Sequence, residues 1–219
     1  MSVALNGTSL SKIKANSLNL AGTFGFTGTV SGLADETPLV LISTFTSDGS
    51  DATASFTSGI DSTYKEYLFV FNNIHPGTNA SYLRFSPSID GGSNYNLSNT
   101  STLFYAYQRE DGGGFTALEY GSGQDTATGS NVYIGGDTGN ESDECVSGIF
   151  KLYNPSSTTH VKHFLGITNS SDGGSGTNTY CFSAYSAGYV NTTSAVNAVK
   201  FTFHSGQIQG GTIDLFGVV

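Results

Sequence analysis

The sequence predicts an all-β protein, an antiparallel jelly-roll-like β-sandwich. The first observation is composition, since 29 glycines, 12 tyrosines and 15 phenylalanines in 219 residues favour short strands and tight turns. The second is periodicity, because apolar and polar residues alternate in many short segments and no amphipathic helical segment stands out. The third is the regular spacing of turn signals such as Asp90-Gly91-Gly92 between those segments. No repeat of fixed length appears, which argues against a propeller or a solenoid.

Ten to twelve short strands are predicted from Leu39 onward. The strongest lies at 64–74, where Tyr67, Phe69 and Phe71 point to one face and the residues between them to the other. We therefore expect Phe69 or its immediate neighbours to be buried in the core. The segments with strand character are 39–45, 52–57, 64–74, 81–89, 102–108, 115–120, 131–135, 146–153, 160–168, 179–187, 198–204 and 212–218.

Residues 1–37 are predicted to form an extended N-terminal arm, followed by the sandwich domain at 38–219. Apolar and polar residues alternate with interspersed glycines over 18–30, which is strand periodicity. A single ribbon cannot bury its apolar face by itself, so it must pair with the rest of the chain, with sister subunits or with another protein. The candidate assembly residues are its apolar positions, namely Leu18, Leu20, Phe24, Phe26 and Val30.

The charge balance is acidic, with 8 Lys and Arg against 17 Asp and Glu and a formal net charge of −9. Such a surface repels phosphate backbones and anionic lipids, so we expect no nucleic-acid partner and no membrane partner. No run of about 18 apolar residues is present, and residues 1–20 lack the apolar core of a signal peptide. We expect a soluble chain made in a cytoplasm, with Cys145 and Cys181 reduced and buried.

Motifs that could carry chemistry are weak, so no catalytic, cofactor-binding or metal-binding residue is predicted. His160 and His163 lie in a predicted strand, where positions three apart face opposite sides and cannot chelate one ion. The acidic segment 137–144 lacks the spacing of an EF-hand and is predicted to be a solvated loop. Segment 86–95 resembles the Asp-box of sialidases and predicts a hairpin turn. No nucleophile elbow of the form Gly-x-Ser-x-Gly is present.

Two other functions stay open at the level of sequence. Carbohydrate binding could use tyrosines on strand edges or loops, although half-buried sheet aromatics are the commoner explanation. A hydrolase would need a pocket that brings two carboxylates together, whereas almost all Asp and Glu fall in turn segments. The tyrosines considered for carbohydrate binding are Tyr105, Tyr107, Tyr120 and Tyr185.

Several separated segments resemble small virion proteins of tailed phages, mainly phages that infect marine cyanobacteria and other marine bacteria. The resemblance is carried by GIDSTYKEYLFVFNNIHP at 59–76, DGGSNY at 90–95 and YNPSSTTHVKHF at 153–164. Segments 187–206 and 211–218 are similar to that family too. The likeness covers roughly residues 37–219, and the arm is similar to the Gly- and Thr-rich segments that precede such modules in fibre-like proteins.

The resemblance implies a non-enzymatic structural role in the virion, without a cofactor. The expected assembly is a homotrimer that contacts other virion proteins, either the major capsid protein or tail proteins. A capsid decoration or cement protein is favoured, because an arm of 37 residues without shaft repeats suits a compact knob better than a fibre. The alternative is a short tail fibre or spike whose sandwich binds a host surface glycan.

Overall fold

A computed structural model describes residues 38–113, 116–172 and 179–219. The predicted arm lies outside these residues, as do its candidate assembly positions Leu18, Leu20, Phe24, Phe26 and Val30. The described residues form thirteen strands and no helix, so none of them belongs to a helix that could cross a membrane. Each of the twelve predicted segments overlaps a strand, although several strands extend beyond the predicted bounds, and the predicted all-β class is confirmed.

The strands follow one another along the chain with short connections. One of them, β7, was not predicted, because its four residues are mostly Thr and Gly without an apolar alternation. The strands are β1 (Leu39–Thr46), β2 (Ala54–Phe56), β3 (Glu66–Pro76), β4 (Leu83–Ser88), β5 (Asn99–Arg109), β6 (Thr116–Tyr120), β7 (Thr126–Gly129), β8 (Val132–Tyr133), β9 (Val146–Tyr153), β10 (Lys162–Asp172), β11 (Tyr180–Val190), β12 (Ala198–Phe203) and β13 (Ile208–Val218).

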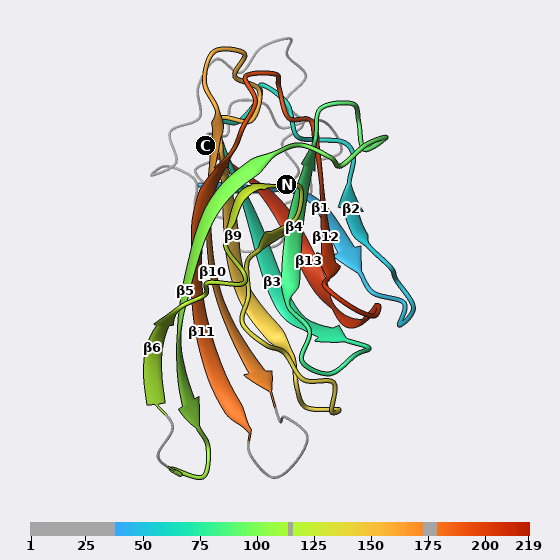
Figure 1. Cartoon of the computed structure of the whole chain (residues 1–219). Coiled ribbons are helices and arrows are strands. Elements are labelled where there is room, and N and C mark those ends of the chain that lie inside the picture. The colour runs from blue at the N-terminus through green and yellow to red at the C-terminus, as the bar shows by residue number, and fades with distance from the viewer. Residues whose placement is uncertain (1–37, 114–115, 173–178) are drawn as a thin grey trace, which may run out of the picture. The chain divides into compact units, whose positions relative to one another are not determined.

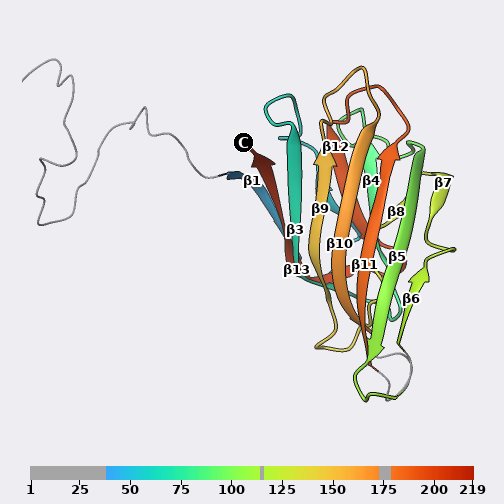
Figure 2. The ribbon, with the colours of Figure 1, turned by 90° about the vertical axis from the view of Figure 1, so that its left-hand side faces the viewer.

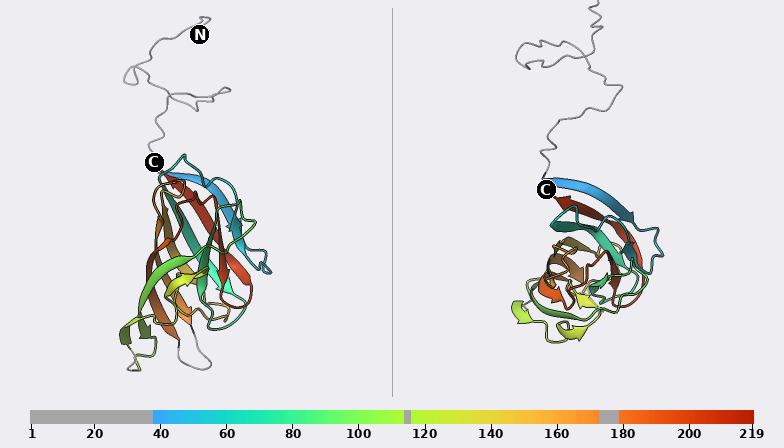
Figure 3. Two further views of the ribbon diagram at one scale, coloured as in Figure 1. Left: turned by 45° about the horizontal axis from the view of Figure 1, so that its top comes forward. Right: turned by 90° about the horizontal axis from the view of Figure 1, so that it is seen from above.

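The strands form two antiparallel sheets that pack as a sandwich. The large sheet has the order β1-β13-β3-β9-β10-β11-β5-β6, with β7 also paired to β5, and the small sheet has the order β2-β12-β4-β8. Figure 1 and Figure 2 show the small sheet lying against one face of the large one. Viewed from above, the large sheet is curved (Figure 3). The sandwich is confirmed, while the jelly roll stays a prediction, because nine and four strands differ from two four-stranded sheets.

An aromatic core fills the space between the sheets. Phe201 of β12 lies with its ring centroid 5.0 Å from the centroids of both Phe69 and Phe71 on β3. Phe85 of β4 lies 4.5 Å from Phe150 of β9. Tyr67, Phe69 and Phe71 are each exposed by 1% or less, so the expected burial of this strand is confirmed. Such edge-to-face and tilted pairs add to the free energy gained by burying apolar area.

Irregular pairing at one end of the large sheet keeps apolar residues on the core side. Ile74 is buried like Phe71, although residues three apart in a regular strand face opposite sides. The register of β3 against β9 shifts between these two residues, and Asn73 there has a φ of 51°. A matching shift in β13 surrounds Gly211, whose φ is 93°. These bulges reset the alternation so that the core remains continuous.

The far ends of β5 and β11 extend past the small sheet (Figure 1). Along β11, the inward residues Ala184 and Val190 are fully buried, whereas Phe182 is only half-buried. Along β5, Leu103 is fully buried and Tyr105 half-buried. The inner face of the large sheet is therefore covered by the small sheet over part of its length only.

Candidate assembly surface

A row of apolar side chains crosses the outer face of the large sheet, which is the face turned away from the small sheet. The strand register places one such residue on each of six neighbouring strands, from β3 to β6. In antiparallel sheets with one covered face, the other face is usually polar. We call these residues the outer row: Val70, Ile149, Ile167, Tyr185, Phe104 and Tyr120.

The outer row is most exposed at its β11–β5–β6 end. Tyr185, Phe104 and Tyr120 are exposed by 41%, 45% and 54%, and Leu118 of β6 by 72%. The rings of Phe104 and Tyr185 are stacked, with centroids 5.2 Å apart and planes 7° apart. Large aromatic and aliphatic side chains that gather on an open face mark a contact surface more often than isolated ones do.

A second apolar group lies at the opposite edge of the same face. Leu41 of β1 is exposed by 56% and pairs in register with Phe216 of β13. Leu39 is exposed by 38% and pairs with Val218. Within the described residues β1 pairs with β13 alone, so its other backbone edge is open to a further strand. We call Leu39 and Leu41 the β1 edge.

Charged groups on this face are few and already have partners. The Lys151 ammonium lies 2.6 Å from the Glu66 carboxylate, and this hydrogen bond raises the pKa of Lys151. The Asp214 carboxylate accepts the Thr44 hydroxyl at 2.6 Å. Among the described residues of β10, β11, β5 and β6, the positions in register on the outer face contain no Asp, Glu, Lys or Arg. This half of the face therefore favours apolar and neutral contacts.

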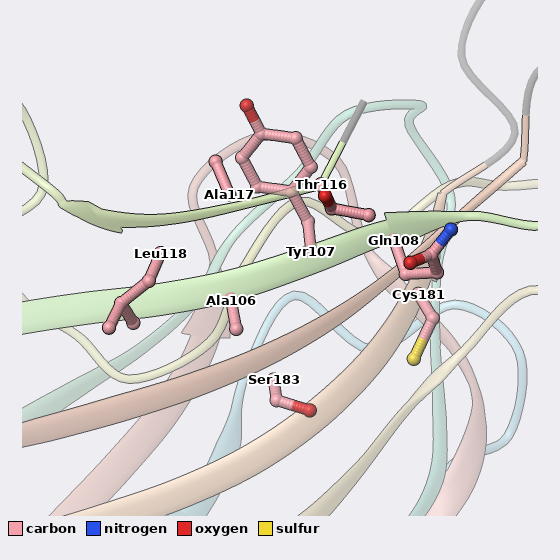
Figure 4. A pocket seen from close by; sticks show the side chains of 8 residues that line it. All are labelled: Ala106, Tyr107, Gln108, Thr116, Ala117, Leu118, Cys181 and Ser183. Carbon is pink, nitrogen blue, oxygen red and sulfur yellow. The ribbon is translucent and has the colours of Figure 1, made fainter. Parts of the chain in front are cut away.

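A shallow groove of about 530 Å³ runs across β6, β5 and β11 beside the outer row. Ala106, Ser183 and Cys181 project to the same side of these strands, and Tyr107 to the other (Figure 4). Small side chains make a low floor, and the exposed Leu118 lies at the β6 wall. We call this hollow the groove. Its lining residues are Ala106, Tyr107, Gln108, Thr116, Ala117, Leu118, Cys181 and Ser183.

Both cysteines are free, but their predicted burial is wrong for one of them. Cys181 is exposed in the groove, because it occupies an outward position of β11. Cys145 is half-buried beside β9, and burial raises the pKa of its thiol. A lone exposed thiol on a contact surface gives a chemical handle for testing that surface.

The four tyrosines considered for carbohydrate binding divide between the two faces. Tyr120 and Tyr185 belong to the outer row, whereas Tyr105 and Tyr107 lie on the inner face where the small sheet ends. There they form a cluster with Tyr180 and Phe182, with ring centroids between 5.6 and 6.2 Å apart. The half-buried sheet aromatics expected from the sequence are thus found at Tyr105 and Tyr107.

A carboxylate adjoins this inner aromatic cluster. The Tyr107 hydroxyl donates to Glu119 Oε1 at 3.0 Å, and this hydrogen bond raises the pKa of Tyr107. Burial, followed by the charge of Glu119, raises the pKa of Tyr105. Aromatic rings beside a hydrogen-bond acceptor are the groups that sugar-binding sites combine, although here the rings mainly pack on one another.

The acidic segment 137–144 is a loop, as predicted, and its residues 140–143 are exposed, but its two ends are packed into the protein. Thr138 is fully buried and Glu144 is 4% exposed. The Asp137 carboxylate accepts the Tyr82 hydroxyl at 2.8 Å, and burial raises the pKa of Asp137. The Ser170 hydroxyl donates to the Asp137 carbonyl at 2.6 Å. These contacts fasten the segment to β10, which composition alone does not reveal.

The two histidines considered as metal ligands are not placed as predicted. His160 lies in the loop before β10, so the expectation that both side chains belong to one strand is wrong. His163 is exposed on β10, with its ring 5.9 Å from that of Tyr189. Within the ranges that the structure describes, no three His, Cys, Asp or Glu side chains gather as a metal site would require.

The segment 86–95 forms a tight turn but not a hairpin. Asp90 accepts hydrogen bonds from the backbone and side-chain nitrogens of Asn94 and from the Ser88 hydroxyl. The bonds from Asn94 and Ser88 lower the pKa of Asp90 to about 2. The turn leads from β4 in the small sheet to β5 in the large one, and these strands do not pair. The predicted hairpin is therefore corrected to a connection between sheets.

A second pocket, of about 300 Å³, brings His75 and Cys145 to one lining. Burial and the charge of Asp143 raise the pKa of the Cys145 thiol, which disfavours the thiolate that a nucleophile needs. The His75 Nδ1 lies 2.6 Å from the Glu144 carbonyl oxygen. The Glu144 carboxylate accepts the backbone N–H of Glu141 at 2.8 Å. Asp143 and Glu144 both line this pocket, but Glu144 is only 4% exposed and its carboxylate already accepts that backbone hydrogen bond.

Comparisons with family models, with curated proteins and with solved structures gave no match for this chain. The functional argument therefore rests on the geometry of the molecule. Its most unusual feature is the outer face of the large sheet, which combines the outer row, the β1 edge and the groove. Sequence reasoning missed this surface, because it becomes visible only when the register of eight strands is known.

Proposed function

We propose that this chain is a non-enzymatic structural protein of a tailed-phage virion, a decoration or cement protein on the outside of the capsid. It is made in the host cytoplasm and then becomes part of the virion. There it assembles as a homotrimer and contacts other virion proteins, the major capsid protein first among them. The resemblance of segments across residues 37–219 to phage virion proteins motivates the biological setting.

One observation carries the proposal, namely the apolar outer face of the large sheet. Phe104, Tyr120 and Leu118 alone leave 45%, 54% and 72% of their surfaces exposed on one side of the molecule. A subunit that works in isolation gains nothing from such a face and becomes prone to aggregation. A subunit of a larger assembly buries the same face against its neighbours. The exposed apolar face therefore favours a protein that functions as a subunit of a larger assembly.

The packing and the charge of the protein are compatible with a position on the surface of a virus particle. The described residues form a sandwich whose core is packed with aromatic rings, and neither cysteine takes part in a disulfide. Stability in this domain thus comes from buried apolar area and strand pairing, which need neither an oxidising compartment nor a cofactor. The net charge of −9 also discourages unspecific adhesion to other anionic surfaces.

The test locates the protein on purified particles. Immunogold labelling and electron cryomicroscopy of the phage should find it on the capsid exterior at regular lattice positions. Labelling confined to the tail would replace decoration by the short tail fibre or spike. Absence from purified particles would refute both versions.

Deleting residues 1–37 tests the predicted anchoring arm. The deletion should leave a folded domain, because residues 37–219 form a compact unit of their own. Particles grown with the shortened chain should lack it, whereas those grown with the full chain should carry it. Full occupancy by the shortened chain would show that the arm is not the anchor.

A receptor-binding spike is the second candidate, and the inner aromatic cluster favours it. Tyr105 and Tyr107 lie beside Glu119 at an end of the sandwich that the small sheet leaves uncovered. A glycan array should then give hits that Tyr107→Ala abolishes and Tyr120→Ala, on the outer face, retains. An array without hits would remove this candidate.

A further inference from the structure

Strand β1 has free backbone hydrogen-bonding groups along one side. The Val219 N–H donates to the Pro38 carbonyl at 3.1 Å, at the point where β1 begins to pair with β13. In an antiparallel ladder, residues that bond to one neighbouring strand alternate with residues whose N–H and C=O point to the other side. The N–H and C=O groups of Leu39 and Leu41 therefore point away from β13. Among the described residues, no strand pairs with that side of β1.

This open side is poorly protected compared with the other ends of the two sheets. β1 has eight residues, against five in β6, three in β2 and two in β8. Its sequence, LVLISTFT, contains no charged residue and no proline, whereas edge strands are usually short or carry such residues. A register shift between Leu41 and Ser43 interrupts the ladder, but the two leucines of the β1 edge are still exposed by 56% and 38%. Such an edge is suited to accept a further strand.

The chain contains a segment whose residue pattern matches this edge. Residues 18–30 lie outside the described residues, but in the sequence all their candidate assembly positions are even-numbered, from Leu18 to Val30. In a strand, even-numbered positions share one face. Leu39 and Leu41 likewise share the outer face of the large sheet. A strand formed by 18–30 beside β1 can therefore place its apolar face next to the β1 edge, as cross-strand pairs that stabilise a sheet.

The connection between this segment and β1 favours a neighbouring copy as the acceptor. To fold back onto its own β1, the chain would need a hairpin loop of residues 31–37, which is longer than the two to five residues of most hairpins. Thr37 also precedes Pro38, and the residue before a proline favours an extended backbone. Residues 31–38 can span at most about 29 Å, which is enough to reach an adjacent copy.

We propose that residues 18–30 of one copy add as a strand to the open side of β1 in the next copy, with their apolar positions against the β1 edge. Backbone hydrogen bonds hold the added strand, and its alternate apolar side chains set its register. This inference rests on the homotrimer of the proposed function and deepens it, because it names the surface that receives the arm. In a closed ring each copy donates one strand and accepts one, so that every β1 is covered.

Disulfide formation tests this pairing in the full chain with Cys145→Ser and Cys181→Ser. Opposite residues of a hydrogen-bonded pair have Cα atoms about 5.5 Å apart, a distance that a disulfide spans. Leu41→Cys is combined in turn with a cysteine at position 24, 26 or 28. One of these three should link to position 41 of another copy under mild oxidation, and covalent trimers should appear on a denaturing gel. A cysteine at position 25 or 27 serves as the control and should not link, because it lies on the opposite face of the alternation.

Three results of the disulfide experiment would overturn the proposed pairing. The first is the absence of links at 24, 26 and 28. The second is equal linking at 25 and 27, which would show contact without strand register. The third is a product that remains monomeric on the gel although peptide mass spectrometry finds the link, because the segment would then pair with its own copy.

Sedimentation of the full chain gives a second, independent readout. The unaltered chain should sediment as a trimer. Leu41→Lys places a charge at an exposed edge position and should raise the concentration needed for assembly by at least about tenfold. Phe24→Ser with Phe26→Ser should have the same effect, whereas Thr27→Ser with Thr29→Ser, on the other face of the alternation, should not. Equal melting curves would show that all variants fold, and unchanged assembly of Leu41→Lys would refute the contact.

The outcomes separate this interface from the proposed function. A chain that stays monomeric at high concentration but labels the capsid would refute the strand exchange and leave the decoration role standing. Linked trimers that are absent from purified particles would support the strand exchange and refute the virion role. The two proposals can therefore fail independently.

Discussion

The same strands form both faces of the large sheet, since successive residues point to opposite sides. Only the inner face, however, is covered by the small sheet. On β9, Phe150 is fully buried under the small sheet, while its half-buried neighbour Ile149 belongs to the outer row. Both residues are large and apolar. Alternation therefore tells which residues share a face, but it does not tell which face has a partner. That difference separates the core of this fold from its candidate assembly surface.

The largest expected effect on stability comes from shortening the side chains of two adjacent residues that lie on these opposite faces. Phe150→Ala should lower the free energy of unfolding by about 3–5 kcal/mol, because it opens a cavity among four aromatic rings. Ile149→Ala should cost about 1 kcal/mol, because its side chain is already partly in water. Denaturant unfolding at low protein concentration measures both.

The same pair also tests whether the outer face is covered in the assembled protein. At high protein concentration the cost of Ile149→Ala should rise, while that of Phe150→Ala should stay about the same. Equal costs for the two variants at low concentration would mean that the two faces do not differ as the structure indicates.

A smaller effect is expected where bulges decide which face a residue joins. A Cβ at Gly211 would lie 2.3 Å from the Asn73 carbonyl oxygen, at a φ of 93°. Gly211→Ala should therefore cost about 2–3 kcal/mol, because backbone atoms must shift as well as the φ angle. At Gly91, φ is 69° and a Cβ would meet nothing within 4 Å, so Gly91→Ala should cost only about 1 kcal/mol. A chemical denaturation series compares them, and similar losses would argue against tight packing at the bulge.

Much of the inner face could be predicted from the sequence, because strand alternation is a local property. Tyr67, Phe69 and Phe71 follow one another at every second position, and all three are buried as expected. Ile74 lies on the same face only because of the bulge at Asn73, and the local alternation of apolar and polar residues does not predict that bulge. Local periodicity ends where the register of two strands shifts.

The outer face could not be predicted, because it depends on long-range pairing. Val70 and Tyr185 lie 115 positions apart in the chain, and only the order and register of the strands between them place both in one row. The start of the acidic segment gives a second example. Asp137 is polar and lies between Gly136 and Thr138, so composition predicts a solvated position, whereas contacts with Tyr82 and Ser170 hold it in place.

The smallest expected effect concerns the Asp137 carboxyl group, which lies near the end of the sandwich where the small sheet no longer covers the inner face. Burial raises the pKa of Asp137 above its ordinary value of 3.8, so the folded protein holds this proton more tightly than the unfolded chain. Stability from this group is present below the ordinary pKa and is lost as pH rises through the raised one. Asp137→Asn keeps an oxygen that can accept the Tyr82 hydroxyl but cannot ionise. The free energy of unfolding of the variant should therefore improve relative to the unaltered protein as pH rises from 3.8 toward neutrality.

A carboxyl with the opposite shift provides the control for this pH dependence. The backbone N–H of Thr63 lowers the pKa of the exposed Asp61, so stability from Asp61 is lost as pH falls. The free energy of unfolding of Asp61→Asn should thus fall relative to that of the unaltered protein as pH rises, whereas that of Asp137→Asn should increase. Unfolding curves at a series of pH values measure both slopes. Slopes of the same sign would mean that Asp137 is hydrated like a surface carboxylate, and that water reaches the inner face further than the packing around Tyr82 indicates.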